Sequence, residues 1–371
     1  MINHIAFKMV GPYHNEVGIP CQDSFFVFDN KEEEITIAAV ADGLGSEKYS
    51  DIGSKIASKV AVENCAANYK KGMHFNEAKK IMNNAYVYAY RAILEEADKA
   101  GNPDDQYDTT LALAIYDGTH LFYGQSGDSG IIALLSNGHY VRVTRQQRDD
   151  EGRVYPLCFG PTYWEFGEVS EDVSSVMLMT DGVWAEIAPP VIDDHEQNVN
   201  VNLAMRFMDR DETEDEEVKA VENQAVEFMQ SYRKDRIDDD KTIVVLYNTN
   251  LHAQRLTDEY YSPLDWESLN KEYYAANADN SDDGDGHGSP EEENDSRLNG
   301  DDNSEKHELS DIADVKEANS GSAIVDLEVQ VSNCSNSTFS DSTSIGALSH
   351  FNLGLRKMFD DIKVRMMRIL K

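Results

Sequence analysis

The sequence predicts an α+β fold in which antiparallel strands form a sandwich and helices group in pairs. Short apolar segments rich in β-branched residues recur along roughly the first 250 residues. Two turn signals, Asp117-Gly118-Thr119 and Asn137-Gly138, join neighbouring segments as hairpins. The helical patterns lie between groups of strands and do not alternate with single strands, which argues against βαβ units. Strands are expected at residues 24–28, 35–41, 110–116, 120–126, 130–135, 174–180 and 241–247.

Three helices are expected between these strands. One begins near Ser50, a second spans about Asn76 to Lys99, and a third runs from about Val218 to Tyr232. In each of them, apolar residues recur three or four positions apart and form one stripe. This is the pattern of an amphipathic helix.

The composition excludes several classes of protein. The chain of 371 residues carries a formal net charge of −36, which argues against a nucleic-acid partner. The N-terminus shows no signal peptide, and no apolar run approaches the length of a membrane span. The four cysteines, Cys21, Cys65, Cys158 and Cys334, are too widely spaced for a disulfide framework or a zinc site. We therefore expect a cytoplasmic protein.

The composition also divides the chain into segments. Residues 1–250 are expected to form one globular domain, followed by a connecting segment at 251–269. Residues 270–345 are acidic, rich in Ser, Asn and Gly, and nearly free of large apolar side chains. Such a segment cannot bury enough surface to offset its ordering entropy, so it is expected to be disordered. Residues 346–371 are expected to contain a basic amphipathic helix.

This terminal helix has three interpretations. Residues 353–371 combine an apolar stripe with arginines and lysines, which suits the surface of an anionic membrane or a groove on a partner protein. The helix could equally dock back onto its own acidic domain. Asp360 and Asp361 interrupt the basic face and weaken the membrane interpretation.

Aspartates stand at the ends of the predicted strands. The apolar segment "ITIAAVA" ends on Asp42-Gly43, a second strand ends on Asp181-Gly182, and Asp128 lies between two strands. Asp23 begins another strand, and the aspartates at 238–240 directly precede the last one. A single Asp-Gly is usually a turn. Five such sites in one domain favour a metal centre, because Mg²⁺ and Mn²⁺ prefer oxygen ligands.

Six short motifs follow one another in an order that resembles a known family. The order and spacing resemble the metal-dependent serine/threonine protein phosphatases (the PPM or type-2C class), especially the bacterial branch, over roughly residues 5 to 250. The motifs are "GIPCQDSF", "VADGLGSEKYSDIGSKIAS", "DTTLALAIY", "GQSGDSG", "MTDGVWAEI" and "DDDKTIVVL". The resemblance implies a four-layer αββα sandwich, with two antiparallel sheets between helix pairs.

The resemblance also implies a ligand set for two Mn²⁺ or Mg²⁺ ions. Asp42 would bridge the two ions, and the Gly43 carbonyl would bind one of them. Asp181 and Asp239 would bind the first ion, and Asp239 is preferred to its neighbour because it opens the Asp-x-x-Thr ending of its motif. Asp23 would hold metal-bound water, and Asp128 would lie near a weaker third metal. We accordingly expect Asp240→Asn to matter far less than Asp239→Asn.

The implied reaction is hydrolysis of phosphoserine or phosphothreonine in proteins. A hydroxide that bridges the metals would attack phosphorus in line, without a phosphoenzyme. The expected partner is a phosphoprotein substrate of a serine/threonine kinase. The alternative is a catalytically weak or silent member of the family that acts as a binding or regulatory module.

The chain departs from the family pattern at three positions. Gly18 stands where many members have an arginine that grips the phosphate, and Leu44 stands where many have a histidine after the Asp-Gly. Ala185 replaces the usual extra aspartate of the third metal site, with Glu186 as a candidate substitute. His14 is a candidate catalytic residue that could take over phosphate binding, and an ordinary surface or core histidine is an equal interpretation.

Overall fold

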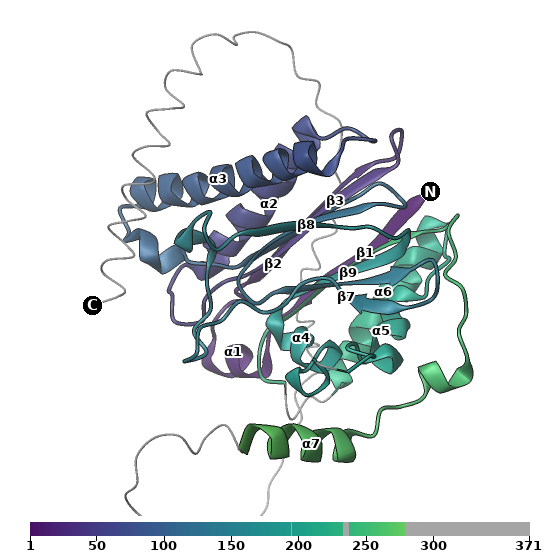
Figure 1. The fold of residues 1–371 in the computed structure, drawn as a ribbon. Helices are drawn as coiled ribbons and strands as arrows, with labels where there is room; N and C mark the ends of the chain where they lie inside the picture. Colours follow the sequence, from purple (N-terminus) through teal and green to yellow (C-terminus); the bar gives the residue numbers. More distant parts are fainter. Residues whose placement is uncertain (194, 233–236, 279–371) are drawn as a thin grey trace, which may run out of the picture. The chain divides into compact units, whose positions relative to one another are not determined.

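The computed structural model describes residues 1–193, 195–232 and 237–278, and its centre is a pair of five-stranded sheets (Figure 1). All strand pairings in both sheets are antiparallel. The first sheet consists, in spatial order, of β1 (Ile2–Met9), β10 (Lys241–Asn248), β9 (Val173–Met179), β6 (Gly130–Leu135) and β7 (Tyr140–Arg142). The second consists of β2 (Asp23–Asn30), β3 (Ile35–Asp42), β4 (Leu111–Tyr116), β5 (Leu121–Ser126) and β8 (Glu165–Val169).

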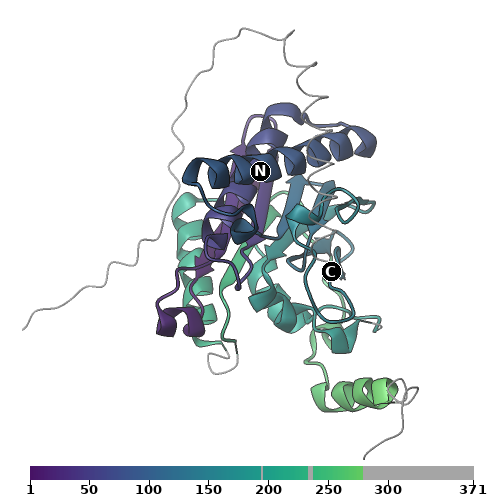
Figure 2. The ribbon, with the colours of Figure 1, turned by 90° about the vertical axis from the view of Figure 1, so that its left-hand side faces the viewer.

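Helices cover the outer face of each sheet (Figures 1 and 2). The second sheet is covered by α2 (Ser50–Asn68) and α3 (Phe75–Ala100), which pack against each other. The first sheet is covered by α4 (Asp181–Ile187), α5 (Val201–Met208) and α6 (Asp215–Ser231). The expected four-layer αββα sandwich is therefore confirmed.

The core between the sheets is built from small and β-branched side chains. Ala38 and Val40 of β3 are fully buried there with residues of β6, β9 and β10, such as Ala133, Leu178 and Val244. Side chains of a strand alternate between its two faces, and both faces of β3 are covered. Nearly every residue of "ITIAAVAD" is therefore buried, and only its last residue, Asp42, is partly open to water.

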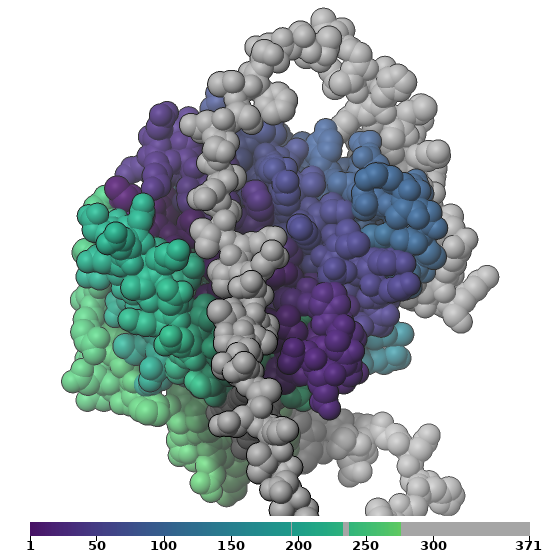
Figure 3. All heavy atoms as spheres, turned by 180° about the vertical axis from the view of Figure 1, so that it is seen from behind, coloured from purple at the N-terminus to yellow at the C-terminus, as the bar shows by residue number. Residues whose placement is uncertain are grey.

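The edge strand β1 is covered by α6. The backbone N–H of Ala6 donates to Glu222 Oε2 over 3.0 Å, which satisfies a donor that the sheet leaves unpaired. In Figure 3, which shows the molecule from behind, the teal residues of α6 and the purple N-terminal residues are both visible on this face. The sequence predicted α6 but missed β1 and β8.

The described residues after β10 include further regular structure. It contains a 3₁₀ turn at Asp258–Tyr261 and helix α7 (Trp266–Ala278). It is tied to the domain because Gln254 N–H donates to the Ser136 carbonyl over 2.8 Å, and Tyr140 N–H donates to the Tyr260 hydroxyl over 2.8 Å.

Helix α7 corrects one predicted boundary. It crosses residue 270, so the first part of the segment predicted as disordered is helical. The rest of that segment and the predicted helix at 346–371 lie outside the described residues. Within the described ranges, no helix combines the length and apolar character needed to cross a membrane.

Candidate active site

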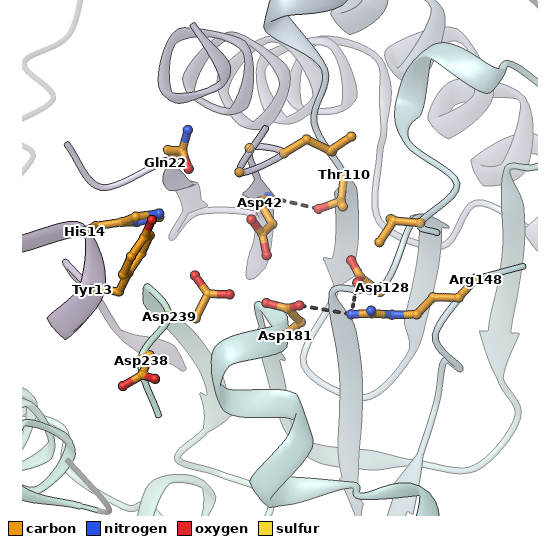
Figure 4. Close-up of a pocket in the computed structure, with 14 residues that line it drawn as sticks. Tyr13, His14, Gln22, Asp42, Thr110, Asp128, Arg148, Asp181, Asp238 and Asp239 are labelled. Carbon is orange, nitrogen blue, oxygen red and sulfur yellow. Dashed lines mark hydrogen bonds and ion pairs between the residues drawn. The ribbon is translucent and has the colours of Figure 1, made fainter. Parts of the chain in front are cut away.

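Four of the five predicted strand-end sites contribute aspartates to a pocket of about 370 Å³ (Figure 4). It opens at the edge of the sandwich where β3 ends, β9 passes into α4, and β10 begins. The pocket is lined by Tyr13, His14, Gln22, Asp42, Gly43, Leu44, Gly45, Thr110, Asp128, Arg148, Val154, Asp181, Asp238 and Asp239.

Asp42 is held by its backbone at the end of β3. Its N–H donates to Thr110 Oγ1 over 2.9 Å, and its carbonyl accepts from Thr109 Oγ1 and from Thr110 N–H, each over 2.8 Å. The neighbouring Gly43 packs so tightly that a Cβ there would lie 2.6 Å from the Ser50 carbonyl oxygen. Only glycine fits at this position. The backbone of Asp42 is therefore held in place, and this restricts where its carboxylate can lie.

Three carboxylates converge in the pocket. Ligand oxygens of Asp42, Asp128 and Asp181 all lie within 4.8 Å of one another. They come from three connections distant in sequence: the end of β3, the β5–β6 loop and the first residue of α4. The Asp181 Oδ1 atom is buried and has no hydrogen-bond partner within the described chain. Such a cluster is repulsive by itself and suits a bound cation.

The repulsion among these carboxylates, together with their burial, shifts their pKa values. Burial, followed by the charges of Asp23, Asp181 and Asp128, raises the pKa of Asp42 well above its usual range. Burial and Asp181 raise the pKa of Asp128 to about 7, although Arg148 acts in the opposite direction. Repulsion among these carboxylates therefore favours their protonated forms, and a divalent cation would compete with those protons.

Arg148 is the cation that faces this cluster. Its Nη2 atom pairs with Asp128 Oδ2 and lies 3.1 Å from Asp181 Oδ2 (Figure 4). It comes from the long connection between β7 and β8, in which sequence reasoning identified no functional residue. An arginine in a polar loop has no sequence signal that separates it from an ordinary surface arginine.

The adjacent residues Asp239 and Asp240 have different surroundings. Asp239 lines the pocket, and burial followed by Asp181 raises its pKa. Asp240 does not line it and is only 2% exposed. Its two carboxylate oxygens accept the backbone N–H groups of Gly11 over 2.6 Å and Gln22 over 2.7 Å. Of the two aspartates, Asp239 is the one that lines the pocket, and its role as a metal ligand stays a prediction.

The expectation that Asp240 matters little does not agree with its surroundings. Gly11 and Gln22 lie at the two ends of the segment that joins β1 to β2, and this segment carries α1 (Pro12–Val17). Asp240 therefore fixes one wall of the pocket to the strand that follows Asp239. The spacing in "DDDK" gave no sign of this, because the partners are backbone groups more than 200 residues away.

His14 lies on that wall. It belongs to α1, is 8% exposed and lines the pocket, and its Nδ1 atom lies 3.0 Å from Asp240 Oδ1. The structure thus places His14 at the site, as expected for a catalytic candidate.

Asp23 lies beneath the pocket and does not line it. It is 1% exposed, pairs in register with Asp42, and accepts the hydroxyls of Thr180 over 2.7 Å and Thr242 over 2.8 Å. These threonines precede α4 and lie in β10, so Asp23 joins β2 of one sheet to the other sheet. Burial raises its pKa well above the usual range. In this arrangement Asp23 supports the ligand-bearing segments from below.

Comparison with known proteins connects this geometry to a family. The family model described as protein phosphatase 2C matches residues 10–216. The chain belongs to the protein phosphatase 2C family. It is thus a protein serine/threonine phosphatase by family, a class of metal-binding hydrolases that act on phosphoproteins.

Several solved structures, among them a bacterial serine phosphatase, resemble the fold at low sequence identity. A bacterial serine phosphatase is 13% identical, with a TM-score of 0.48, and the match covers 69% of this chain and 100% of that one. RsbX in complex with magnesium is 15% identical, with a TM-score of 0.41 and coverage of 66% and 94%. Serine/threonine phosphatase Stp1 from Staphylococcus aureus is 13% identical, with a TM-score of 0.43 and coverage of 67% and 95%. No curated protein matches significantly.

The family departures can now be located in this phosphatase. Gly18 ends α1 in the left-handed conformation and does not line the pocket, whereas Leu44 does. Glu186 accepts the hydroxyl of Tyr232 over 3.3 Å and is absent from the pocket lining. Glu186 therefore does not take the place of the aspartate that Ala185 replaces.

The donor set fits hard divalent cations. The pocket offers carboxylates from Asp42, Asp128, Asp181 and Asp239 together with the backbone of Gly43, and no cysteine lines it. Zinc sites generally use Cys or His ligands, whereas Mg²⁺ and Mn²⁺ prefer oxygen. The residues present therefore match the divalent metal that the protein phosphatase 2C family uses.

Proposed function

We propose that this chain hydrolyses phosphoserine and phosphothreonine in proteins with two Mn²⁺ or Mg²⁺ ions, opposing a serine/threonine kinase. The observation that carries the proposal is the convergence of Asp42, Asp128 and Asp181 within 4.8 Å in an open pocket. A protein that used this fold only for binding would have no need for three closely spaced carboxylates there, since each one destabilises the others.

The proposed ligands divide by position. Asp42 at the end of β3 would hold both ions, with the Gly43 carbonyl beside it, and Asp181 and Asp239 would complete the ligands of the first ion. Asp128, which adjoins Asp181, is assigned to a weaker third ion. Two bound ions would lower the pKa of a shared water and offset the charge on the phosphoryl oxygens, so that water attacks phosphorus without a phosphoenzyme.

The protein supplies positioning around that chemistry. Asp23 holds the hydroxyls of Thr180 and Thr242, and this fixes the segments that carry Asp181 and Asp239 relative to β2. The wall that carries His14 is fixed by Asp240. His14 Nε2 is assigned to the substrate, where it contacts a phosphoryl oxygen or gives a proton to the departing serine or threonine oxygen.

The experiment is hydrolysis of phosphoserine and phosphothreonine peptides by the full chain, with and without Mn²⁺. Release of inorganic phosphate that depends on Mn²⁺ is the expected result. A folded protein that binds Mn²⁺ but releases no phosphate from peptides or from an aryl phosphate would instead be a silent binding module. An Asp181→Asn variant controls for contaminating phosphatases, because it should lose the activity of the site.

The C-terminal segment carries a separate prediction on location. Residues 353–371 are proposed to tether a cytoplasmic enzyme to a partner protein or an anionic membrane, and docking onto the enzyme itself stays the alternative. Deletion of residues 346–371 should leave hydrolysis of a small aryl phosphate nearly unchanged and should change the location in the cell. An unchanged location, with unchanged activity on the phosphoprotein substrate, would contradict the prediction.

A further inference from the structure

Arg148 stands at the mouth of the pocket. Its side chain is 37% exposed, and its guanidinium faces Asp128 and Asp181. Among the described residues that line the pocket, it is the sole lysine or arginine. The nearby Lys241 does not line the pocket, because its Nζ is directed to the carbonyls of Ile237 and Asp239.

The backbone that carries Arg148 is tied to the loop that carries Asp128. The N–H of Gly127 donates to Gln147 Oε1 over 2.9 Å, and Gln147 N–H donates back to the Gly127 carbonyl over 3.1 Å. Gln146 Nε2 donates to the Asp128 carbonyl over 3.3 Å. The position of Arg148 over Asp128 is therefore built by hydrogen bonds that join Gln146 and Gln147 to the backbone of the Asp128 loop, and it does not depend on the side-chain ion pair alone.

A short hairpin braces the other side of Arg148. Arg148 forms an isolated bridge with Val154, and Asp149 N–H donates to the Arg153 carbonyl over 2.9 Å. The Asp149 carboxylate accepts from Arg153 Nε over 2.7 Å. These contacts fix the Cα of Arg148. Its guanidinium also donates from Nη1 to the Gly152 carbonyl over 3.4 Å, so the side chain would have to exchange this long bond and its carboxylate contacts to turn toward a substrate.

Among the described residues of the pocket, no lysine or arginine other than Arg148 is placed to bind a phosphate monoester. The position where many relatives have a phosphate-binding arginine is Gly18, which lies outside the pocket lining. An arginine presents several N–H donors in a planar fork that matches two phosphate oxygens, and such charged hydrogen bonds are strong. Arg148 can bring this fork to the pocket from the side opposite His14 (Figure 4).

We propose that Arg148 is the phosphate-binding residue of this enzyme and that divalent cations release it for that task. The proposal rests on the proposed function, since it takes the same pocket as the substrate site. Without cations, the guanidinium neutralises Asp128 and Asp181. A divalent cation on these carboxylates takes over their charge, and the guanidinium is then free for the anionic substrate.

Replacing Arg148 should have opposite effects on Mn²⁺ binding by the metal-free protein and on phosphate binding by the Mn²⁺-loaded protein. Arg148→Gln removes the competitor for Asp128 and Asp181, so Mn²⁺ should bind severalfold more tightly in the absence of substrate. The same substitution removes a charged hydrogen bond to phosphate, so inorganic phosphate should bind the Mn²⁺-loaded protein about 10-fold to 100-fold more weakly. Arg148→Lys keeps the charge without the fork and should lie between the two.

The experiment is calorimetric titration of the full chain with Mn²⁺ alone, and then of the Mn²⁺-loaded chain with inorganic phosphate. Arg145→Gln is the matched control, because Arg145 is an exposed side chain of the same connection that does not line the pocket. It should behave as the wild type in both titrations. Circular dichroism confirms that each variant is folded.

Each outcome decides a part of the proposal. If folded, Mn²⁺-loaded Arg148→Gln binds inorganic phosphate as tightly as the wild type does, Arg148 does not bind phosphate and this part of the proposal fails. Mn²⁺ binding that is unchanged or weaker in Arg148→Gln would overturn the release by cations. If the wild type binds both ligands but hydrolyses nothing, the proposed function fails, while the two titrations still decide the role of Arg148.

Discussion

The Nδ1 atom of His14 lies 3.0 Å from the Oδ1 atom of Asp240. The carboxylate of Asp240 also accepts hydrogen bonds from two backbone N–H groups. His14, which lines the pocket, is thereby joined through the buried carboxylate of Asp240 to the start of β10. This relationship separates two adjacent aspartates by function: Asp239 faces the pocket and Asp240 holds its wall.

Replacing Asp240 should therefore unfold or loosen the protein. In Asp240→Ala, the buried N–H groups of Gly11 and Gln22 lose a charged acceptor, and each such bond contributes about 1.5–3 kcal/mol. The free energy of unfolding should fall by about 3 kcal/mol or more, measured by urea denaturation with chelator present.

Asp239→Asn is the matched comparison at the next residue. It should leave the free energy of unfolding of the metal-free protein nearly unchanged and weaken Mn²⁺ binding. If Asp240→Ala is as stable as wild type and Asp239→Asn is the less stable one, the division between the two residues is wrong.

His14→Asn tests the catalytic role of the histidine without disturbing its neighbour. The asparagine amide can still reach toward Asp240, but it cannot supply the ring Nε2 to a substrate. We expect Mn²⁺ affinity to stay within about twofold, while kcat/KM falls by roughly 100-fold, the lower range for loss of a general acid or base. Unchanged kcat/KM on a phosphopeptide would make His14 an ordinary wall residue.

Asp42→Asn should stabilise the metal-free protein, and more so at higher pH. An aspartate with a raised pKa binds its proton more tightly in the folded protein than in the unfolded chain. Its ionisation therefore costs stability as the pH rises above about 4, up to its pKa in the folded protein. The Tm advantage of the variant over wild type, both in chelator, should grow between pH 5 and pH 8.

The same variant should bind Mn²⁺ at least about 100-fold more weakly, the upper loss seen for residues that merely support a ligand. Excess Mn²⁺ should therefore raise the Tm of wild type far more than that of Asp42→Asn. A Tm difference in chelator that shrinks from pH 5 to pH 8 would contradict the assigned repulsion.

Much of the fold was predictable because local patterns and tertiary packing agree. The segment 35–41 is apolar throughout and became a strand buried on both faces, and the turn at Asn137-Gly138 joins β6 to β7. The strands that sequence reasoning missed have weaker patterns. β8 is mostly exposed or half-buried, and β1 mixes polar and apolar residues because it is an edge strand covered by α6.

The sequence predicted those site residues that belong to a recognisable local motif. Asp42, Asp128, Asp181 and Asp239 stand beside strands, and the structure brings all four to one pocket. Arg148 and Asp240 were not assigned, since their partners lie 20 to 229 residues away and are defined by the packing. Asp23 was expected to hold metal-bound water. It lies beneath the pocket and accepts two threonine hydroxyls, and its role toward a metal stays a prediction.

The most direct test of the carboxylate site is removal and return of the metal. The full chain is treated with chelator, freed of it by dialysis, and assayed on a phosphothreonine peptide during titration with Mn²⁺ or Mg²⁺. Activity should be absent after chelation, return with either ion, and stay absent in Asp42→Asn at the Mn²⁺ concentration that saturates the wild type. Undiminished turnover after thorough chelation would contradict a hydrolysis that depends on these carboxylates and their metals.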